Sequence, residues 1–204
     1  MKTEVIIAGH GGQGVLELAN NISYFYMLQG RHVAFTPSYG PESRGGKVKC
    51  YVVGSVEEID SPIVEEPDFL IVMNIPSMDF VPMLKEGGTL LVNTSLVTTP
   101  PSRKGIKVVG VQATEIASSL REFAPEAGKD TSIVANSVMF GAYLALTEGE
   151  VEAEINAAQA VFDHFLTDRK AAYIPLNLRA VRAGYSFVKE GREGWPVSPQ
   201  NILA

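Results

Sequence analysis

A glycine-rich turn between a strand pattern and a helix pattern constrains the fold of this chain more than any other feature. Residues 4–8 read EVIIA, a short β-branched run that is typical of a buried strand. After GHGGQG, apolar residues recur at helical spacing over 15–29, and a glycine follows where a helix would end. Residues 32–35 resemble a second strand. The order strand, turn, helix, strand favours an α/β fold built on a parallel sheet.

The remaining patterns complete this prediction: an open, mostly parallel sheet with flanking helices and a helical C-terminal part. Residues 69–73 are an unbroken apolar run, as expected of a central parallel strand. Residues 47–53 alternate apolar and polar side chains, which indicates a strand with one wet face, antiparallel or at the sheet edge. Residues 36–46 read as a loop. Further strands are predicted at 89–93 and 107–111, and helices at 77–85, 131–146, 151–166 and 178–188.

Size and charge limit the classes of protein that this chain can belong to. We expect its 204 residues to form a single domain over 1–204. A net charge of −6 argues against nucleic acid as a partner, because phosphate binding takes a basic face. No apolar stretch reaches the roughly 20 residues of a membrane span. The single cysteine suits a reducing compartment. We therefore expect a cytoplasmic protein with no membrane partner.

The glycine turn admits three interpretations. Gly9, Gly11 and Gly14 match G-x-G-x-x-G, a pattern that lets the backbone approach an anion at a helix N-terminus. A nicotinamide or flavin site would also take an acidic residue after the second strand, where residues 35–38 read FTPS. This weakens the dinucleotide interpretation and leaves a phosphate site, a glycine-lined subunit contact or a purely structural turn. No P-loop, nucleophile elbow or metal-ligand spacing is present, so we assign no catalytic and no metal-binding residue.

A second cluster, residues 39–46, reads YGPESRGG and combines an aromatic ring, a carboxylate, a hydroxyl and an arginine. We expect this loop beside the glycine turn, at the carboxyl end of the sheet, where α/β proteins bind ligands. It is either a solvated loop with a weak Glu42–Arg44 pair or the carrier of an arginine for a phosphate, a carboxylate or a partner chain. The candidate binding residues are Gly9, Gly11, Gly12, Gln13 and Gly14 in the turn, and Tyr39, Glu42, Arg44, Gly45 and Gly46 in the loop.

The two clusters together carry a resemblance to a known family. GHGGQGV at 9–15, followed by YGPESRGG at 39–46, closely resembles the gamma subunit of 2-oxoacid:ferredoxin oxidoreductases, most nearly that of the 2-oxoglutarate enzyme. The resemblance continues in order along most of the chain, through IDSP at 59–62, Asp68, NSVMFGA at 136–142, Asn177 and AGY at 183–185.

This resemblance implies an accessory subunit of a multi-subunit enzyme, a single domain of the pyruvate/ketoisovalerate oxidoreductase gamma type. Such an enzyme oxidatively decarboxylates a 2-oxoacid, joins the acyl group to coenzyme A and passes electrons to ferredoxin. In the family, thiamine diphosphate lies between the alpha and beta chains, and the iron–sulfur clusters lie on other chains. The gamma chain is linked with assembly and with the coenzyme A side.

The implied partners are the alpha and beta chains, with a delta chain as a further candidate and ferredoxin reached through the complex. The chain alone is expected to bind no cofactor, in keeping with its single cysteine, because an iron–sulfur cluster takes about four. Pyruvate, a branched-chain 2-oxoacid and the related indolepyruvate enzyme stay open. The alternatives from other classes are a free-standing nucleotide- or dinucleotide-binding protein using the 9–14 turn and an interaction module without a ligand.

Overall fold

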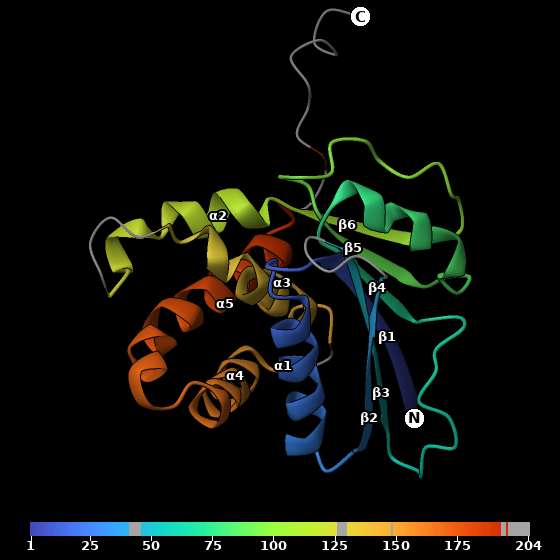
Figure 1. Ribbon diagram of the computed structural model, residues 1–204, viewed down its shortest axis with the longest axis horizontal. Coiled ribbons are helices and arrows are strands. Elements are labelled where there is room, and N and C mark those ends of the chain that lie inside the picture. Colours follow the sequence, from blue (N-terminus) through green and yellow to red (C-terminus); the bar gives the residue numbers. More distant parts are fainter. Residues whose placement is uncertain (41–45, 126–129, 148, 193–194, 196–204) are drawn as a thin grey trace, which may run out of the picture.

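A six-stranded sheet runs through the molecule in the order β2-β3-β1-β4-β5-β6 (Figure 1). The computed structural model describes residues 1–40, 46–125, 130–147, 149–192 and 195. The strands are β1 (Lys2–His10), β2 (His32–Tyr39), β3 (Lys47–Ser55), β4 (Phe69–Val72), β5 (Thr89–Asn93) and β6 (Lys107–Val111).

The direction of the strands confirms the predicted α/β class, with one correction. β1, β4, β5 and β6 pair in parallel, whereas β3 is antiparallel to both β1 and β2. The prediction that residues 47–53 form an antiparallel strand is therefore right, but their placement at the sheet edge is wrong. β2 is the edge strand, because β2 and β3 form a hairpin and β3 inserts beside β1. The alternation also ends early, since Val52 and Val53 are both buried.

The helices gather on one face of the sheet (Figure 1). They are α1 (Val15–Leu28), α2 (Ala113–Ser119), α3 (Ala135–Leu144), α4 (Val151–Phe165) and α5 (Ile174–Lys189). Short 3₁₀ helices connect them: η2 (Arg121–Phe123), η3 (Ser132–Val134) and η4 (Asp168–Tyr173). Another 3₁₀ helix, η1 (Ile75–Met83), packs on the opposite face through Val81. Among the described residues, no helix has both the length and the apolar character that crossing a bilayer requires.

Three predicted elements need correction, one in its type and two in their bounds. The helix predicted at 77–85 is the 3₁₀ helix η1, which carries Pro82, a residue without a backbone N–H to donate. The helix predicted at 131–146 begins with the 3₁₀ turn η3 and becomes α-helical only at Ala135. The loop predicted at 36–46 is shorter, because β2 continues to Tyr39 as the hairpin partner of β3.

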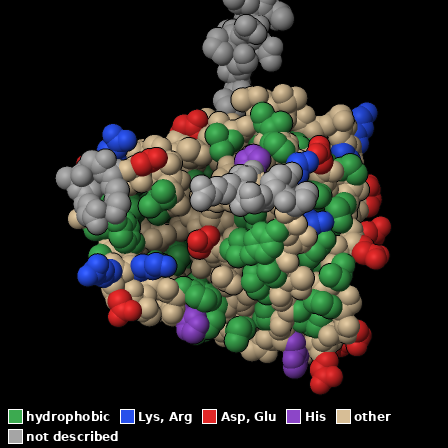
Figure 2. Space-filling view, viewed as in Figure 1, with side chains coloured by type: hydrophobic (Ala, Val, Ile, Leu, Met, Phe, Trp, Pro, Cys, Tyr) green, Lys and Arg blue, Asp and Glu red, His purple; other side chains and the backbone are tan. Residues whose placement is uncertain are grey.

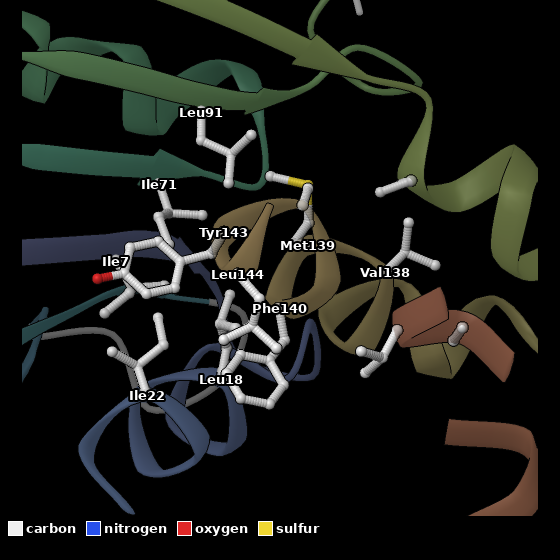
Figure 3. Packing of buried hydrophobic residues seen from close by; sticks show 14 of the residues in the cluster. Ile7, Leu18, Ile22, Ile71, Leu91, Val138, Met139, Phe140, Tyr143 and Leu144 are labelled. Carbon is white, nitrogen blue, oxygen red and sulfur yellow. The ribbon is translucent and has the colours of Figure 1, made fainter. Parts of the chain in front are cut away.

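The main apolar core lies between the sheet and α1 and α3 (Figure 3). Ile7, Ile71 and Leu91 point from adjacent parallel strands toward Leu18 and Ile22 of α1 and toward Met139 and Tyr143 of α3. The alternate residues of the same strands, Ile6, Leu70 and Leu90, enter a second cluster on the other face. Burial on both faces explains why these strands are apolar without a break. All ten residues of α3 are buried, which places this helix at the centre of the helical layer.

Candidate functional site

The glycine turn links the end of β1 to the start of α1 in a conformation that requires glycine. Gly12 has a φ of 97° and Gly14, the N-cap of α1, a φ of 69°, both in the left-handed region that disfavours a Cβ. A Cβ on Gly14 would also overlap the side chain of Asn136 in α3. The turn therefore brings the N-terminus of α1 close to the N-terminus of α3.

Gln13 holds this turn in place from inside. Its Oε1 accepts hydrogen bonds from the backbone N–H of His10 and from Asn74 Nδ2, both at 2.7 Å, and its Nε2 donates to the carbonyl of Met73 at 3.4 Å. Asn74 in turn caps η1, because its Oδ1 accepts from the N–H and the hydroxyl of Ser77. The Gln13 side chain thus fastens the turn to the end of β4. Its predicted contact with a ligand stays a prediction.

Two neighbouring glycines differ in what they do for the fold. A Cβ on Gly9 would lie 2.7 Å from Cγ2 of Val15, so a close approach of β1 and α1 requires this glycine. Gly11 is exposed, its φ is not in the left-handed region, and a Cβ on it would meet nothing within 4 Å. The fold of the described chain therefore does not require glycine at position 11. A bare backbone there leaves space for a ligand or a partner chain.

A cavity of about 490 Å³ opens at this turn, within the size range of small-molecule sites. It lies between the turn, the start of α3 and the η4–α5 segment. Its lining residues include His10, Gly11, Gly12, Lys170, Tyr173 and Asn177. The cavity collects three segments that are far apart in the sequence at the positive end of the α1 dipole.

The electrostatics of the cavity favour an anion. No side chain of the described residues caps the N-terminus of α1, so within this part of the chain its first N–H groups stay available for an acceptor. Lys170 adds a positive charge from η4, which begins at Asp168 with a left-handed φ of 52°. Glu17 in the first turn of α1 lines the same cavity and opposes this charge. His10 also lines it, and its Nδ1 is buried without a hydrogen-bond partner among the described residues.

Asparagine side chains extend the site beyond the residues predicted for it. Asn136 Nδ2 donates to the carbonyl of Gly14 at 3.5 Å, and the hydroxyl of Ser137 and Asn177 Oδ1 are hydrogen-bonded at 2.6 Å. Both asparagines also line an adjoining cavity of about 230 Å³. Both asparagines lie in segments that resemble the gamma subunit, and this resemblance could have identified them as site residues. No sequence pattern points to Lys170, because only the fold of η4 and α5 brings it to the turn.

The second cluster, residues 39–46, lies beside the glycine turn as predicted, at least at Gly46, where the structure describes it. The backbone N–H of Gly11 donates to the carbonyl of Gly46 at 3.3 Å, and that of Gly40 donates to the carbonyl of Lys47 at 2.8 Å. Tyr39 is 62% exposed at the end of β2. Glu42, Arg44 and Gly45 lie outside the described residues. Hydrophobic side chains gather over the start of α1 (Figure 2). Tyr39 and, at 56% exposure, Ile133 are the large exposed apolar residues of this region.

The described residues offer no metal-binding group at the turn. Within the ranges that the structure describes, no group of three or more histidine, cysteine or acidic side chains is placed to hold a metal ion. Cys50 is buried in the core, and burial, followed by the charge of Glu17, raises the pKa of its thiol to about 11. His164 is exposed on α4 and stacks on Tyr24, with ring centroids 4.1 Å apart.

Comparisons with known proteins agree along the chain. Residues 4–187 match the family described as pyruvate ferredoxin/flavodoxin oxidoreductase. Ketoisovalerate oxidoreductase subunit VorA of Methanothermobacter thermautotrophicus is 36% identical over 194 residues, which cover 95% of this chain but 38% of the relative. The 2-oxoglutarate synthase subunit KorC of Methanothermobacter marburgensis is 34% identical over 199 residues, which cover 95% of this chain and 100% of the relative. The chain thus spans well under half of the VorA relative and the whole of KorC.

Solved structures share the same fold. The gamma subunit of a keto/oxoacid ferredoxin oxidoreductase from Geobacter sulfurreducens superposes with a TM-score of 0.72 and 28% identity, over 92% of this chain and 99% of that chain. A 2-oxoglutarate:ferredoxin oxidoreductase from Magnetococcus marinus, determined with 2-oxoglutarate, coenzyme A and succinyl-CoA bound, gives a TM-score of 0.76 over 96% of this chain and 32% of that chain. At 17% identity, that likeness establishes the fold alone.

Proposed function

This chain belongs to the pyruvate ferredoxin/flavodoxin oxidoreductase family, and on that premise we propose that it serves as the gamma subunit of a 2-oxoacid:ferredoxin oxidoreductase. The complex would oxidatively decarboxylate a 2-oxoacid, form the acyl-CoA and pass electrons to ferredoxin. The observation that carries this proposal is the match over the whole length of a relative named as a separate subunit, KorC. The likeness to a solved gamma subunit, over 99% of that chain, supports it.

The donor groups of this chain support a location of the iron–sulfur clusters on other chains. An iron–sulfur cluster takes about four cysteine ligands, and the chain has one cysteine, which is buried in the core. We therefore assign the clusters, together with thiamine diphosphate, to alpha and beta chains, with a delta chain as a further candidate partner. The isolated gamma chain would be inactive, and the complex would meet ferredoxin in the cytoplasm.

The cavity at the glycine turn would serve the coenzyme A side of the reaction. Coenzyme A supplies the thiol that accepts the acyl group, and it carries phosphates that suit an anion site. In this chain, the free N–H groups at the start of α1 and the Lys170 ammonium would hold a phosphate, and Gly11 and Gly12 would let it approach the backbone. Arg44, in the loop that leads to Gly46, is a further candidate for this phosphate.

The same face also suits assembly with a partner chain. Tyr39 and Ile133 are large apolar side chains exposed beside the turn. Gly11, which the fold does not require as glycine, would let a partner's backbone approach. Interfaces between permanently associated chains are more apolar than ordinary surface. The turn and the loop would then contribute to a contact between subunits as well as to an anion site.

For the substrate we propose 2-oxoglutarate. Relatives named for ketoisovalerate and for 2-oxoglutarate are similarly identical to this chain, at 36% and 34%. The KorC relatives, however, are matched over nearly their whole length, whereas VorA carries this unit within a chain more than twice as long. The match over nearly the whole length of relatives named for 2-oxoglutarate supports this choice of substrate.

Affinity purification tests the proposal directly. The tagged chain, recovered from its native host grown without oxygen, should bring down alpha and beta chains of the oxidoreductase. The purified complex should reduce ferredoxin in the presence of coenzyme A, fastest with 2-oxoglutarate and more slowly with pyruvate, 2-ketoisovalerate and indolepyruvate. A chain that co-purifies with nothing and binds a free nucleotide would support a free-standing nucleotide-binding protein instead. A different preferred 2-oxoacid would overturn the substrate alone.

Arg44 separates the two roles proposed for the loop. If the arginine binds a phosphate of coenzyme A, Arg44→Ala should leave the complex assembled and raise the KM for coenzyme A roughly 10- to 100-fold. If it binds a partner chain, the variant complex should dissociate in gel filtration, while the intact fraction keeps its KM. Arg44→Lys should restore little in either case, because lysine lacks the planar pair of donors. Normal assembly with unchanged constants would mean a solvated loop.

A further inference from the structure

A separate cavity lies at the end of α1 opposite the glycine turn and its 490 Å³ cavity. It has a volume of about 360 Å³ and is lined by the end of α1, the start of β4, the end of α3 and the start of α4. Since α1 has 14 residues and rises about 1.5 Å per residue, the two cavities are separated by roughly 20 Å. Nothing in the proposed function uses this end of the sheet.

Glu154 of α4 lines this cavity and carries one unpaired carboxylate oxygen. The residue is 4% exposed, and its Oε1 accepts a hydrogen bond from the Thr147 hydroxyl at 2.8 Å. Its Oε2 is buried without a hydrogen-bond partner among the described residues. Burial raises the pKa of this carboxyl, an effect that the Thr147 hydroxyl and the charge of Lys189 oppose only in part. A buried polar atom left unpaired is costly, and proteins retain few of them without a use.

Aromatic side chains form the walls next to this carboxylate. Tyr143 of α3 and Phe69 of β4 pack edge to face, with ring centroids 5.2 Å apart, and Phe25 and Tyr26 of α1 complete the lining. The hydroxyls of Tyr26 and Tyr143 are hydrogen-bonded to each other. The Tyr143 side chain extends from α3 into the space between the sheet and α1 (Figure 3). Aromatic faces attract cations, so these walls and the carboxylate favour the same kind of ligand.

The arginine at the rim of the cavity is engaged through its Nη2 atom, whereas its Nε is buried without a hydrogen-bond partner among the described residues. The Nη2 atom of Arg31 donates to the carbonyls of Met1 and Gly54 and to the Thr3 hydroxyl, at 2.9 to 3.0 Å. Its guanidinium lies over the Tyr26 ring, 4.6 Å from the centroid. It forms no ion pair with Glu154 within the described part of the chain. The carboxylate therefore keeps its capacity for a cation.

We propose that this cavity binds a small organic cation, a primary amine carried on an apolar or aromatic group, whose ammonium donates to Oε2 of Glu154. The ammonium would satisfy the unpaired oxygen, and the apolar group would fill the space between Phe25, Phe69 and Leu146. Gly149 supports this geometry, because a Cβ on it would overlap the Glu154 carboxylate and displace it. The cavity volume suits a ligand of a few to about twenty non-hydrogen atoms.

Three matched probes test the charge requirement on the purified full chain. Titration calorimetry and thermal unfolding would compare 2-phenylethylamine with 2-phenylethanol and phenylacetate, which share the ring but carry no charge and a negative charge. The amine should bind saturably at one site and raise the Tm, as expected of a ligand that binds only the folded state. The alcohol and the acid should do neither. Equal binding of the alcohol, or no binding of the amine at millimolar concentration, would overturn the proposal.

Variants then test the location. Glu154→Gln keeps the acceptor for Thr147 but removes the charge, and it should weaken amine binding roughly 10- to 100-fold. Glu152→Gln changes an acidic residue that is 75% exposed on the same helix, and it should leave binding unchanged. Leu146→Trp puts a larger side chain into the cavity and leaves Glu154 itself unchanged, and it should also abolish binding. Amine binding that survives both Glu154→Gln and Leu146→Trp would place the ligand elsewhere and contradict the proposal.

Discussion

Gly141 in α3 and Gly184 in α5 each lie against the backbone of the opposite helix. A Cβ on Gly141 would overlap the carbonyl of Val181, and a Cβ on Gly184 would overlap the carbonyl of Val138. The separation of two packed helices depends on the side chains at their contact, so these two glycines let α3 and α5 approach closely. This contact holds α5, and with it the Asn177 side of the cavity, against the start of α3.

Adding a methyl group at this contact should destabilise the protein. Gly141→Ala and Gly184→Ala should each lower the free energy of unfolding by about 1–3 kcal/mol, because backbone atoms cannot move aside as a flexible side chain would. Urea denaturation of the isolated chain measures the effect. Unchanged midpoints for both variants would mean that the helices do not touch at these residues.

Gly11→Ala should separate stability from function. Because a Cβ there meets nothing within 4 Å, the free energy of unfolding of the isolated chain should stay within about 0.5 kcal/mol of the unsubstituted protein. The complex should assemble poorly or show a raised KM for coenzyme A, since the methyl group would occupy space proposed for the ligand or the partner. Normal assembly and kinetics would make Gly11 an ordinary surface residue.

Gln13→Ala should weaken the turn itself. The substitution removes three hydrogen bonds and leaves the amide of Asn74 without its acceptor, which should cost about 1–3 kcal/mol of unfolding free energy. Asn20→Ala, a neighbouring amide in α1, is the matched control and should have little effect. Thermal or urea unfolding compares the two variants. Equal stabilities would contradict the inference that Gln13 fastens the turn to the end of β4.

Stability should depend on pH through Glu154. Burial raises the pKa of this carboxyl in the folded state, so the folded protein binds its proton more tightly than the unfolded chain does. The resulting stabilisation is complete below the ordinary pKa of glutamate, about 4.3, and is lost as the pH rises through the raised value. Glu154→Gln should therefore be more stable than the parent at neutral pH, with the difference vanishing toward pH 4. Glu152→Gln should give no such gain.

Cys50 should resist alkylation in the folded protein. Burial and the nearby negative charge of Glu17 raise the pKa of its thiol to about 11, so the reactive thiolate is scarce at pH 8. Iodoacetamide labelling followed by mass spectrometry should show slow modification in buffer and rapid modification in denaturant. Rapid labelling under native conditions would mean that the β2–β3–β1 region opens readily.

Local signals predicted most of the strands, because runs such as residues 69–73 are apolar on both faces of the sheet. The position of β3 between β2 and β1 could not be predicted this way. Alternating apolar and polar residues indicate that one face of a strand is exposed to solvent, but they do not identify the neighbouring strands. At the candidate site, the turn residues stood out through their glycines. The position of Lys170 at the cavity depends on the packing of η4 and α5, which no local pattern encodes. The inward role of Gln13 depends on Asn74, more than sixty residues away along the chain.

The insertion of β3 between β1 and β2 sets an order in which the sheet can be made. β1 and β2 never touch, so the first 40 residues contain two strands and a helix but not one strand pairing. β3 supplies the pairing partner of both strands, and its Ser55 faces His32 on one side and Lys2 on the other. A chain emerging from the ribosome would therefore hold its glycine turn without the contacts of Gln13 until Met73 and Asn74 have been made, and without Asn136 until α3 has followed.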